Sequence, residues 1–135
     1  MRGPVLRALR SVAAVLAGYA VIVAGTTLAF ETLLGGIGYY KSSGTVLAIA
    51  SVAAFVVGFC GGFVSAWVGG RPRLSHAAGL LIPLAIDTTF VVTSGVSSDP
   101  LWYDLAGSLT LVVAALLGGY ACELIARRRI ALPAA

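Results

Sequence analysis

Charged side chains are scarce in this sequence. Only 10% of its 135 residues are Asp, Glu, Lys or Arg, whereas 59% are hydrophobic, and the mean hydropathy is +1.01. A soluble domain carries roughly 25% charged residues, so this chain has too few charges to cover a globule in water. The shortage excludes an ordinary soluble protein and predicts an integral membrane protein.

Residues that perform chemistry are also scarce. The chain has one His and two Cys, which make no recognisable metal-binding pattern. Its glycine runs lack the Lys-Ser/Thr context of a phosphate-binding loop. Its basic residues flank apolar runs and form no basic stripe or nucleic-acid-binding module. We therefore expect no enzymatic activity, no cofactor, no metal site and no nucleic-acid partner.

Long apolar runs dominate the sequence instead. A membrane-spanning helix needs about 20 mostly apolar residues, and runs of this kind cover about 11–33, 45–69, 74–95 and 101–126. The first is longer than the roughly 7–15-residue apolar core of a cleaved signal peptide, so we expect it to stay in the protein. The expected fold over 1–135 is a single all-α domain, a membrane-embedded four-helix bundle.

Arginine placement predicts the orientation of these spans. With four crossings every arginine falls on one side of the membrane, and Lys41 alone lies on the other. Cytoplasmic loops carry an excess of Lys and Arg. We therefore expect a multi-pass protein of the cell inner (plasma) membrane with both termini in the cytoplasm.

Small residues recur every four positions in the second and fourth runs. Residues four apart lie on one helix face, and small side chains let membrane helices approach closely. The rows predict helix packing inside the bundle, against a second copy or another membrane protein, or both, because each helix has a second row of small residues. The residues expected to pack are Gly58, Gly62, Ala66, Gly118, Gly119 and Cys122.

A short match links the same two runs. Gly61-Gly62-Phe63 and Gly118-Gly119-Tyr120 are separated by a constant offset of 57 residues, from 61 to 118. The match indicates either two copies of a two-helix unit in parallel orientation or a chance recurrence of a glycine motif.

Asp87 is an acidic residue well inside the third run. It follows Arg73 by 14 residues, roughly 21 Å along a helix at 1.5 Å per residue, and no Lys or Arg lies within a run to neutralise it. Intramembrane acids are candidates for proton or ion pathways. Two interpretations remain open: a carboxyl satisfied by Thr26, Thr27 or Lys41, or a transport site.

Pro83 and His76 precede Asp87 in this run. Pro83 has no N–H to bond the carbonyl of Gly79, so we expect a kink there. We also expect a shared face to point to the bundle interior, with His76 at the headgroup level; this face comprises His76, Leu80, Pro83, Asp87 and Ser94. The candidate intramembrane polar site is therefore Asp87, Pro83, Thr27 and His76.

The two ends of the chain carry a resemblance. Val15-Leu16-Ala17-Gly18-Tyr19, together with Leu117-Gly118-Gly119-Tyr120-Ala121-Cys122 and Ile125-Ala126-Arg127-Arg128, resembles short four-span bacterial membrane proteins of uncharacterised function. The resemblance implies four spans and no particular activity. Small multidrug-resistance exporters are similar in size only, because the carboxylate deep in their first helix is missing from 11–30.

These observations lead to two functional hypotheses. The first is a non-enzymatic structural or interaction component, whose partners are the lipid bilayer and either a second copy or another membrane protein. It rests on the small-residue rows and the lack of a catalytic pattern. The alternative is a small transporter or proton-coupled channel centred on Asp87.

Overall fold

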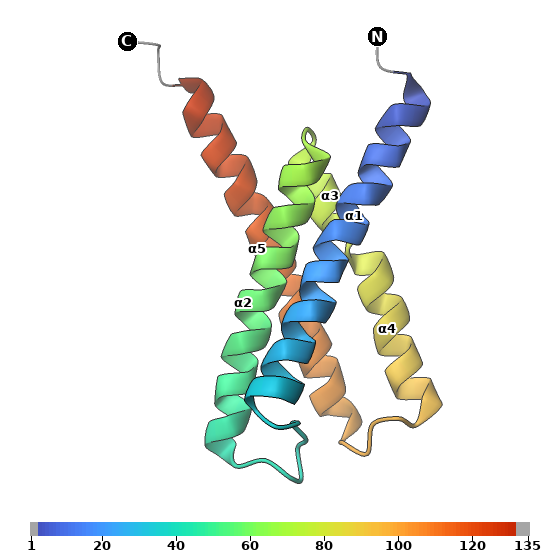
Figure 1. Ribbon diagram of the computed structural model, residues 1–135, viewed down its shortest axis with the longest axis vertical. Helices are drawn as coiled ribbons and strands as arrows, with labels where there is room; N and C mark the ends of the chain where they lie inside the picture. The colour runs from blue at the N-terminus through green and yellow to red at the C-terminus, as the bar shows by residue number, and fades with distance from the viewer. Residues whose placement is uncertain (1–2, 132–135) are drawn as a thin grey trace.

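The computed structural model describes residues 3–131, which form helices joined by short turns (Figure 1). The elements are α1 (Pro4–Thr27), the π-helix η1 (Leu28–Leu33), α2 (Gly44–Gly69), α3 (Arg73–Gly79), α4 (Leu81–Ser94) and α5 (Leu101–Ala131). Because α1 continues into η1 and α3 is followed directly by α4, four segments are long and apolar enough to cross a membrane. They are Pro4–Leu33, Gly44–Gly69, Arg73–Ser94 and Leu101–Arg128. The predicted all-α four-helix bundle is confirmed.

Local sequence sets where these helices begin and end. Pro4 stands at the start of α1, where its missing N–H costs no helical hydrogen bond. The Ser43 hydroxyl caps α2 by accepting a 3.3 Å hydrogen bond from the backbone N–H of Val46. Gly70 and Gly95 follow α2 and α4 with φ values of 71° and 66°, which glycine adopts without strain.

The contact between α2 and α5 is the most extensive in the bundle. A Cβ atom added at Gly62 would collide with the backbone of Ala115, and one added at Gly118 would collide with the backbone of Phe59. The two backbones therefore touch, which only small residues permit. The buried small residues along this contact are Ala50, Ala54, Gly58, Gly62 and Ala66 on α2, and Ala114, Ala115, Gly118 and Cys122 on α5.

A second row of small residues brings in the other helices. Gly18 of α1 lies against Gly61 and Ser65 of α2, and Gly119 of α5 lies against Ala77 of α3. Both rows seen in the sequence are thus used inside one chain. Of the two alternatives left open for them, packing within the bundle accounts for their positions.

The two matching glycine pairs contact different helices. Gly61 faces α1 and Gly62 faces α5, whereas their counterparts Gly118 and Gly119 face α2 and α3. A symmetric duplication would give corresponding glycines corresponding neighbours. The two helices begin at matching positions, Gly44 and Leu101, but their packing is not that of a symmetric repeat.

The third span is interrupted at Leu80, three residues before Pro83. The backbone N–H of Leu80 donates a 3.1 Å hydrogen bond to the carbonyl of Ala77, three residues earlier, and α4 starts at the next residue. The missing N–H of Pro83 explains why the helical ladder stops here, as the sequence predicted. Beyond the break, α4 packs mainly on α5 and stands apart from α1 and α2 (Figure 1).

This break changes the face that the sequence assigned to the bundle interior. His76, Leu80 and Leu84 are buried, but Asp87 and Ser94 are exposed. The expectation of one continuous interior face was therefore wrong beyond Leu84. The turn at Leu80 shifts the helical phase, and α4 leaves the packed core before it reaches Asp87.

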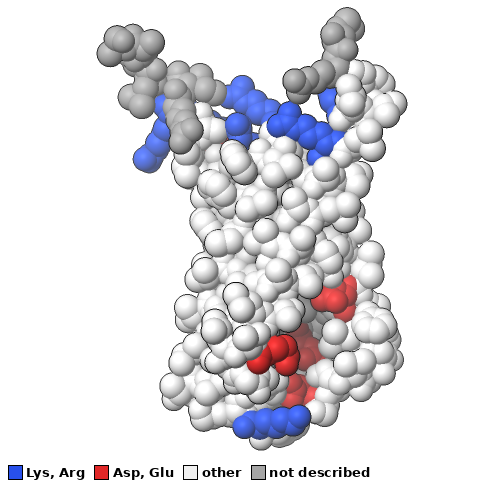
Figure 2. Space-filling view, in the orientation of Figure 1, with Lys and Arg blue, Asp and Glu red and all other residues white. Residues whose placement is uncertain are grey.

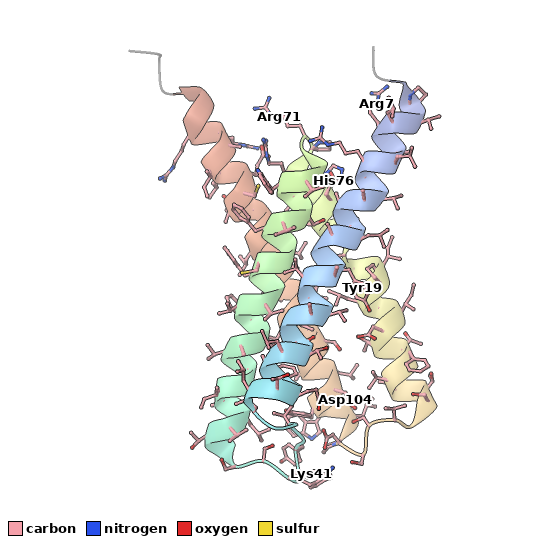
Figure 3. All side chains as sticks on the ribbon, viewed as in Figure 1. Arg7, Tyr19, Lys41, Arg71, His76 and Asp104 are labelled. Atoms are coloured by element: carbon pink, nitrogen blue, oxygen red, sulfur yellow. The ribbon has the colours of Figure 1, made fainter. Side chains whose placement is uncertain are left out.

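Charges separate to opposite ends of the bundle (Figure 2). The described ends of α1 and α5 lie together with the α2–α3 turn, and this end, which we call the arginine end, carries Arg7, Arg10, Arg71, Arg73, Arg127 and Arg128. The opposite end, the acidic end, has Lys41 at its tip (Figure 3), and red carboxylates gather in a hollow just above it (Figure 2). The bundle is therefore strongly polarised along its long axis.

Candidate functional site

A cavity of about 810 Å³ lies in the acidic half of the bundle. Its walls come from the end of α1, from α2, α4 and α5, and from the loops that close the acidic end. It exists because α4 leaves the other helices after the break at Leu80. Its polar and charged lining residues are Thr26, Glu31, Lys41, Ser51, Asp87, Thr88, Ser97, Ser98, Asp99, Asp104, Ser108 and Thr110.

Negative charge predominates in this cavity. Four carboxylates line it and Lys41 is the only basic residue among its lining residues. Asp99 accepts a 3.0 Å hydrogen bond from the backbone N–H of Tyr39, and Asp104 accepts a 3.2 Å bond from the Ser97 hydroxyl. Within residues 3–128 the ion pairs all lie at the arginine end. The cavity therefore keeps a net negative field, which attracts cations.

Asp87 is the deepest of these carboxylates along the membrane-spanning helices. It precedes the end of α4 at Ser94 by roughly 10 Å of helix rise. Its side chain is exposed to the cavity, and no hydrogen bond or ion pair engages it within the described part of the chain. An intramembrane carboxylate of this kind is a candidate cation or proton acceptor.

The threonines expected to satisfy Asp87 do not do so. The Thr26 hydroxyl lines the cavity but donates to the carbonyl of Ile22 at 2.8 Å, within its own helix. Thr27 is exposed and is not among the cavity residues. Of the alternatives left open for Asp87, the bond to a threonine is not formed, because a helical threonine has a carbonyl of its own turn within reach.

One polar contact joins α4 to α5 across the cavity wall. The Thr88 hydroxyl lies 2.8 Å from the Ser108 hydroxyl and forms a hydrogen bond with it. Thr88 follows Asp87 directly, so this bond fixes the height of Asp87 against α5. The next residue, Thr89, bonds only the carbonyl of Ala85 in its own helix at 2.7 Å.

Aromatic rings surround the opening of the cavity at the acidic end. Tyr39 stacks edge-on against Trp102 at 5.1 Å and lies 5.6 Å from Tyr103, measured between ring centroids. All three line the cavity. Aromatic faces attract cations and suit the membrane–water boundary, so the rim is compatible with both roles.

Packed apolar residues close the cavity towards the arginine end. Ile22, Leu80, Leu84 and Ala115 form a buried cluster, and Val15, Tyr19, Val57, Leu111 and Val112 pack around it. In Figure 3 Tyr19 lies at mid-height, with Asp104 and Lys41 at one end and Arg7 and Arg71 at the other. This cluster therefore separates the cavity from the arginine end of the bundle.

The other expected polar residues lie outside this cavity. His76 is buried at the arginine end, where Nδ1 lies 2.8 Å from the Pro72 carbonyl and Nε2 lies 3.1 Å from the Ser11 hydroxyl. Pro83 and His76 both line a second cavity, at the arginine end. The fold thus does not bring Asp87, Pro83, Thr27 and His76 to one place.

Three functional candidates were missed from the sequence: Glu31, Asp99 and Asp104. Each stands near the end of an apolar run, where an acid is unremarkable. The available signal was that four of the five acidic residues fall on the same side of a four-span topology. Only the fold shows that they share one cavity.

No cluster of three or more potential metal ligands occurs in residues 3–128. Comparison of the chain with protein-family models, with curated proteins and with solved structures finds no match.

Proposed function

We propose that this protein is a small membrane transporter or channel that accepts a proton or a monovalent cation at Asp87. One observation carries the proposal. Asp87 lies without a hydrogen-bond or ion-pair partner, among residues 3–128, in a cavity that holds three further carboxylates and a single lysine.

The charge distribution supports entry from the acidic end. Asp99 lies in the loop before α5, Asp104 in the first turn of α5 and Glu31 in η1, so a cation entering from this end meets further carboxylates in the same cavity as Asp87. Apolar walls sharpen that field because they exclude water. At the end of this path, Asp87 is a carboxylate within a membrane-spanning helix, and such acids are candidates for proton or ion pathways.

Passage to the other side requires the apolar cluster around Leu80 and Leu84 to open. The helical break at Leu80 and the light packing of α4 make α4 the element suited to move. Helix motions of this kind open and close access in many membrane proteins. In this proposal α4 moves Asp87 between exposure to one side of the membrane and exposure to the other, while the tightly packed α2–α5 pair stays fixed.

The interaction hypothesis remains a separate prediction. The small-residue rows that motivated it lie inside the monomer, where α2 contacts α1 and α5. They therefore no longer favour docking of a second copy, and the acidic cavity becomes the stronger basis for a function. Transport without covalent chemistry also agrees with the expectation that the protein is not an enzyme.

For the orientation, we propose that the arginine end lies in the cytoplasm and that the protein resides in the inner (plasma) membrane. The polarised charge supports this, because cytoplasmic loops retain Lys and Arg. The test uses Cys60→Ala/Cys122→Ala protein carrying either Lys41→Cys or Arg71→Cys. A membrane-impermeant maleimide should label the first in intact cells and the second only after permeabilisation. The reverse pattern would contradict the orientation.

Flux measurements test the function. The purified protein is reconstituted into liposomes, where proton entry is followed with an internal pH dye and sodium entry with a radioactive tracer. We expect protein-dependent flux of at least one ion. Asp87→Asn, which keeps the shape but removes the charge, should lower that flux at least tenfold, about 1.4 kcal/mol in the barrier.

The matched control is Thr89→Val. Thr89 lies on α4 two residues beyond Asp87 but outside the cavity, so its flux should stay at the wild-type level. Glu31→Gln should lower flux moderately, and the loss should shrink at high salt because the attraction is screened. If Asp87→Asn protein retains wild-type flux, or if wild-type liposomes pass neither ion, the proposal fails.

A further inference from the structure

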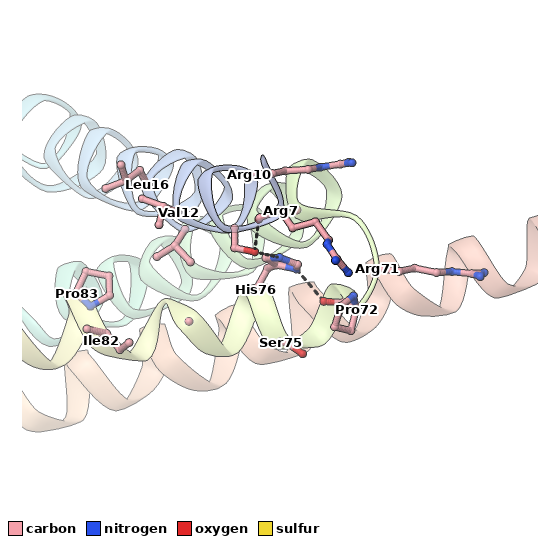
Figure 4. Close-up of a pocket in the computed structure, with 14 residues that line it drawn as sticks. Arg7, Arg10, Val12, Leu16, Arg71, Pro72, Ser75, His76, Ile82 and Pro83 are labelled. Atoms are coloured by element: carbon pink, nitrogen blue, oxygen red, sulfur yellow. Dashed lines mark hydrogen bonds between the residues drawn. The ribbon is translucent and has the colours of Figure 1, made fainter. Parts of the chain in front are cut away.

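A second cavity, of about 720 Å³, opens at the arginine end between α1, the α2–α3 turn, α3 and the first turn of α4 (Figure 4). Apolar residues cluster near the helical break, away from three arginines (Figure 4). No acidic residue lines it. Its ends thus differ sharply in chemistry: one is cationic and faces the membrane surface, and the other is apolar and faces the bilayer core.

The cationic part consists of Arg7, Arg10 and Arg71. Arg10 is fixed in place, because its Nε donates a 2.9 Å hydrogen bond to the carbonyl of Val68. Its guanidinium lies over Gly70, where a Cβ would come within 2.9 Å of a terminal nitrogen. Planar guanidinium groups match the oxygens of a phosphate ester and can bind them in pairs.

The apolar part includes Val12 and Leu16 of α1 and Ile82 of α4. Val12, Leu16 and Ile82 are 58%, 61% and 68% exposed, so each offers a wide surface to a hydrocarbon chain. They continue from the arginines down the same gap between helices (Figure 4). A ligand that fills this cavity therefore needs a negatively charged head and an apolar tail in one molecule.

We infer that this cavity binds an anionic phospholipid. The head phosphate lies among Arg7, Arg10 and Arg71, and one acyl chain runs along Val12, Leu16 and Ile82. Basic pockets between membrane helices are suited to anionic headgroups, and here the charge complementarity is unopposed by any lining carboxylate. This inference does not depend on the proposed transport, because the two cavities share no lining residue.

The test is a titration of the detergent-purified protein with phosphatidylglycerol, with bound lipid counted by native mass spectrometry. Phosphatidylcholine, which has the same tail and no net charge, should bind at least tenfold more weakly. Each basic residue near a headgroup contributes about a fivefold change in affinity, so Arg7→Gln/Arg71→Gln should weaken phosphatidylglycerol binding about 30-fold.

Two matched controls distinguish binding in this cavity from non-specific effects of surface charge and of surface hydrophobicity. Arg127→Gln/Arg128→Gln removes the same charge from the same end but outside the cavity, and it should leave the affinity within about twofold, as expected for screened surface charges. Val12→Trp should fill the apolar part and weaken binding, whereas Leu9→Trp, also on α1 and outside the cavity, should not.

The outcomes show whether the cavity binds a lipid headgroup or free phosphate, and whether binding takes place in this cavity or elsewhere on the arginine end. If inorganic phosphate competes with phosphatidylglycerol at equal concentration, the site binds free anions and the lipid assignment is overturned. Equal losses in the two arginine pairs would overturn the cavity as the site. The melting temperature of each lipid-free variant is measured as well, and a loss of binding is counted only when that temperature is unchanged. If the arginine variants are destabilised, the lipid affinities of Val12→Trp and Leu9→Trp are compared instead, and a loss confined to Val12→Trp supports the cavity as the site.

Discussion

α5 makes two helix contacts that are built from different residues. Against α2 it presents alanine, glycine and cysteine, and the backbones touch at Gly62 and Gly118. Against α4 its contact is smaller, a cavity opens beside it, and a hydrogen bond between Thr88 and Ser108 crosses it. The same helix thus holds one neighbour closely and the other loosely.

The difference follows from the solvent. Lipid tails are as apolar as leucine, so burial of apolar surface does not draw membrane helices together. Where small residues line up, dispersion contacts and close approach hold the pair. Along α4 large side chains such as Ile86 and Phe90 remain exposed, and few small residues face a neighbour. In this bundle, packing strength is therefore set by side-chain size, and the loosely held helix is the one that carries the intramembrane acid.

The largest effect should come from breaking the tight contact. Gly118→Ala adds one methyl group directly against the backbone of Phe59. Backbone atoms cannot rotate away, so α2 and α5 must separate. We expect a loss of about 3 kcal/mol in the free energy of unfolding, the upper end for overpacking, measured by titration of the folded protein with sodium dodecyl sulfate.

Gly107→Ala is the matched control for that variant. Gly107 lies on α5 as well, but a Cβ added there meets no atom within 4 Å. Because alanine favours a helix over glycine, this variant should gain about 0.5–1 kcal/mol. Equal effects of the two substitutions would show that the close backbone approach does not stabilise the bundle.

Much of this fold could be predicted from the sequence. Apolar runs depend on local composition alone, so the four long helices and their turns follow from the positions of Gly70, Gly95 and the charged residues. The kink before Pro83 also follows locally, from one missing N–H. The small-residue rows indicated close packing, but their partners did not follow, because a row of small residues is equally suited to any helix that can approach it.

The candidate site was less predictable. Asp87 was identified because a single carboxylate stands out in an apolar run, whereas Glu31, Asp99 and Asp104 reach the same cavity through loops and helix ends whose paths no local pattern sets. The turn at Leu80 also could not be predicted in enough detail to say which residues of α4 face the other helices. A break in the helix alters the assignment of faces beyond it, so Asp87 lines the acidic cavity, whereas His76, which precedes the break, lines the cavity at the arginine end.

A smaller effect should come from the loose contact. Thr88→Val keeps the side-chain shape but removes the hydrogen bond between α4 and α5. Hydrogen bonds between membrane helices contribute about 0.6 kcal/mol on average, so the same detergent titration should show a loss of that size. Thr89→Val, whose hydroxyl bonds only its own helix, should change stability by less than half as much. If Thr88→Val instead costs as much as Gly118→Ala, α4 is held as firmly as α2, and the idea that α4 moves while α2 and α5 stay fixed must be abandoned.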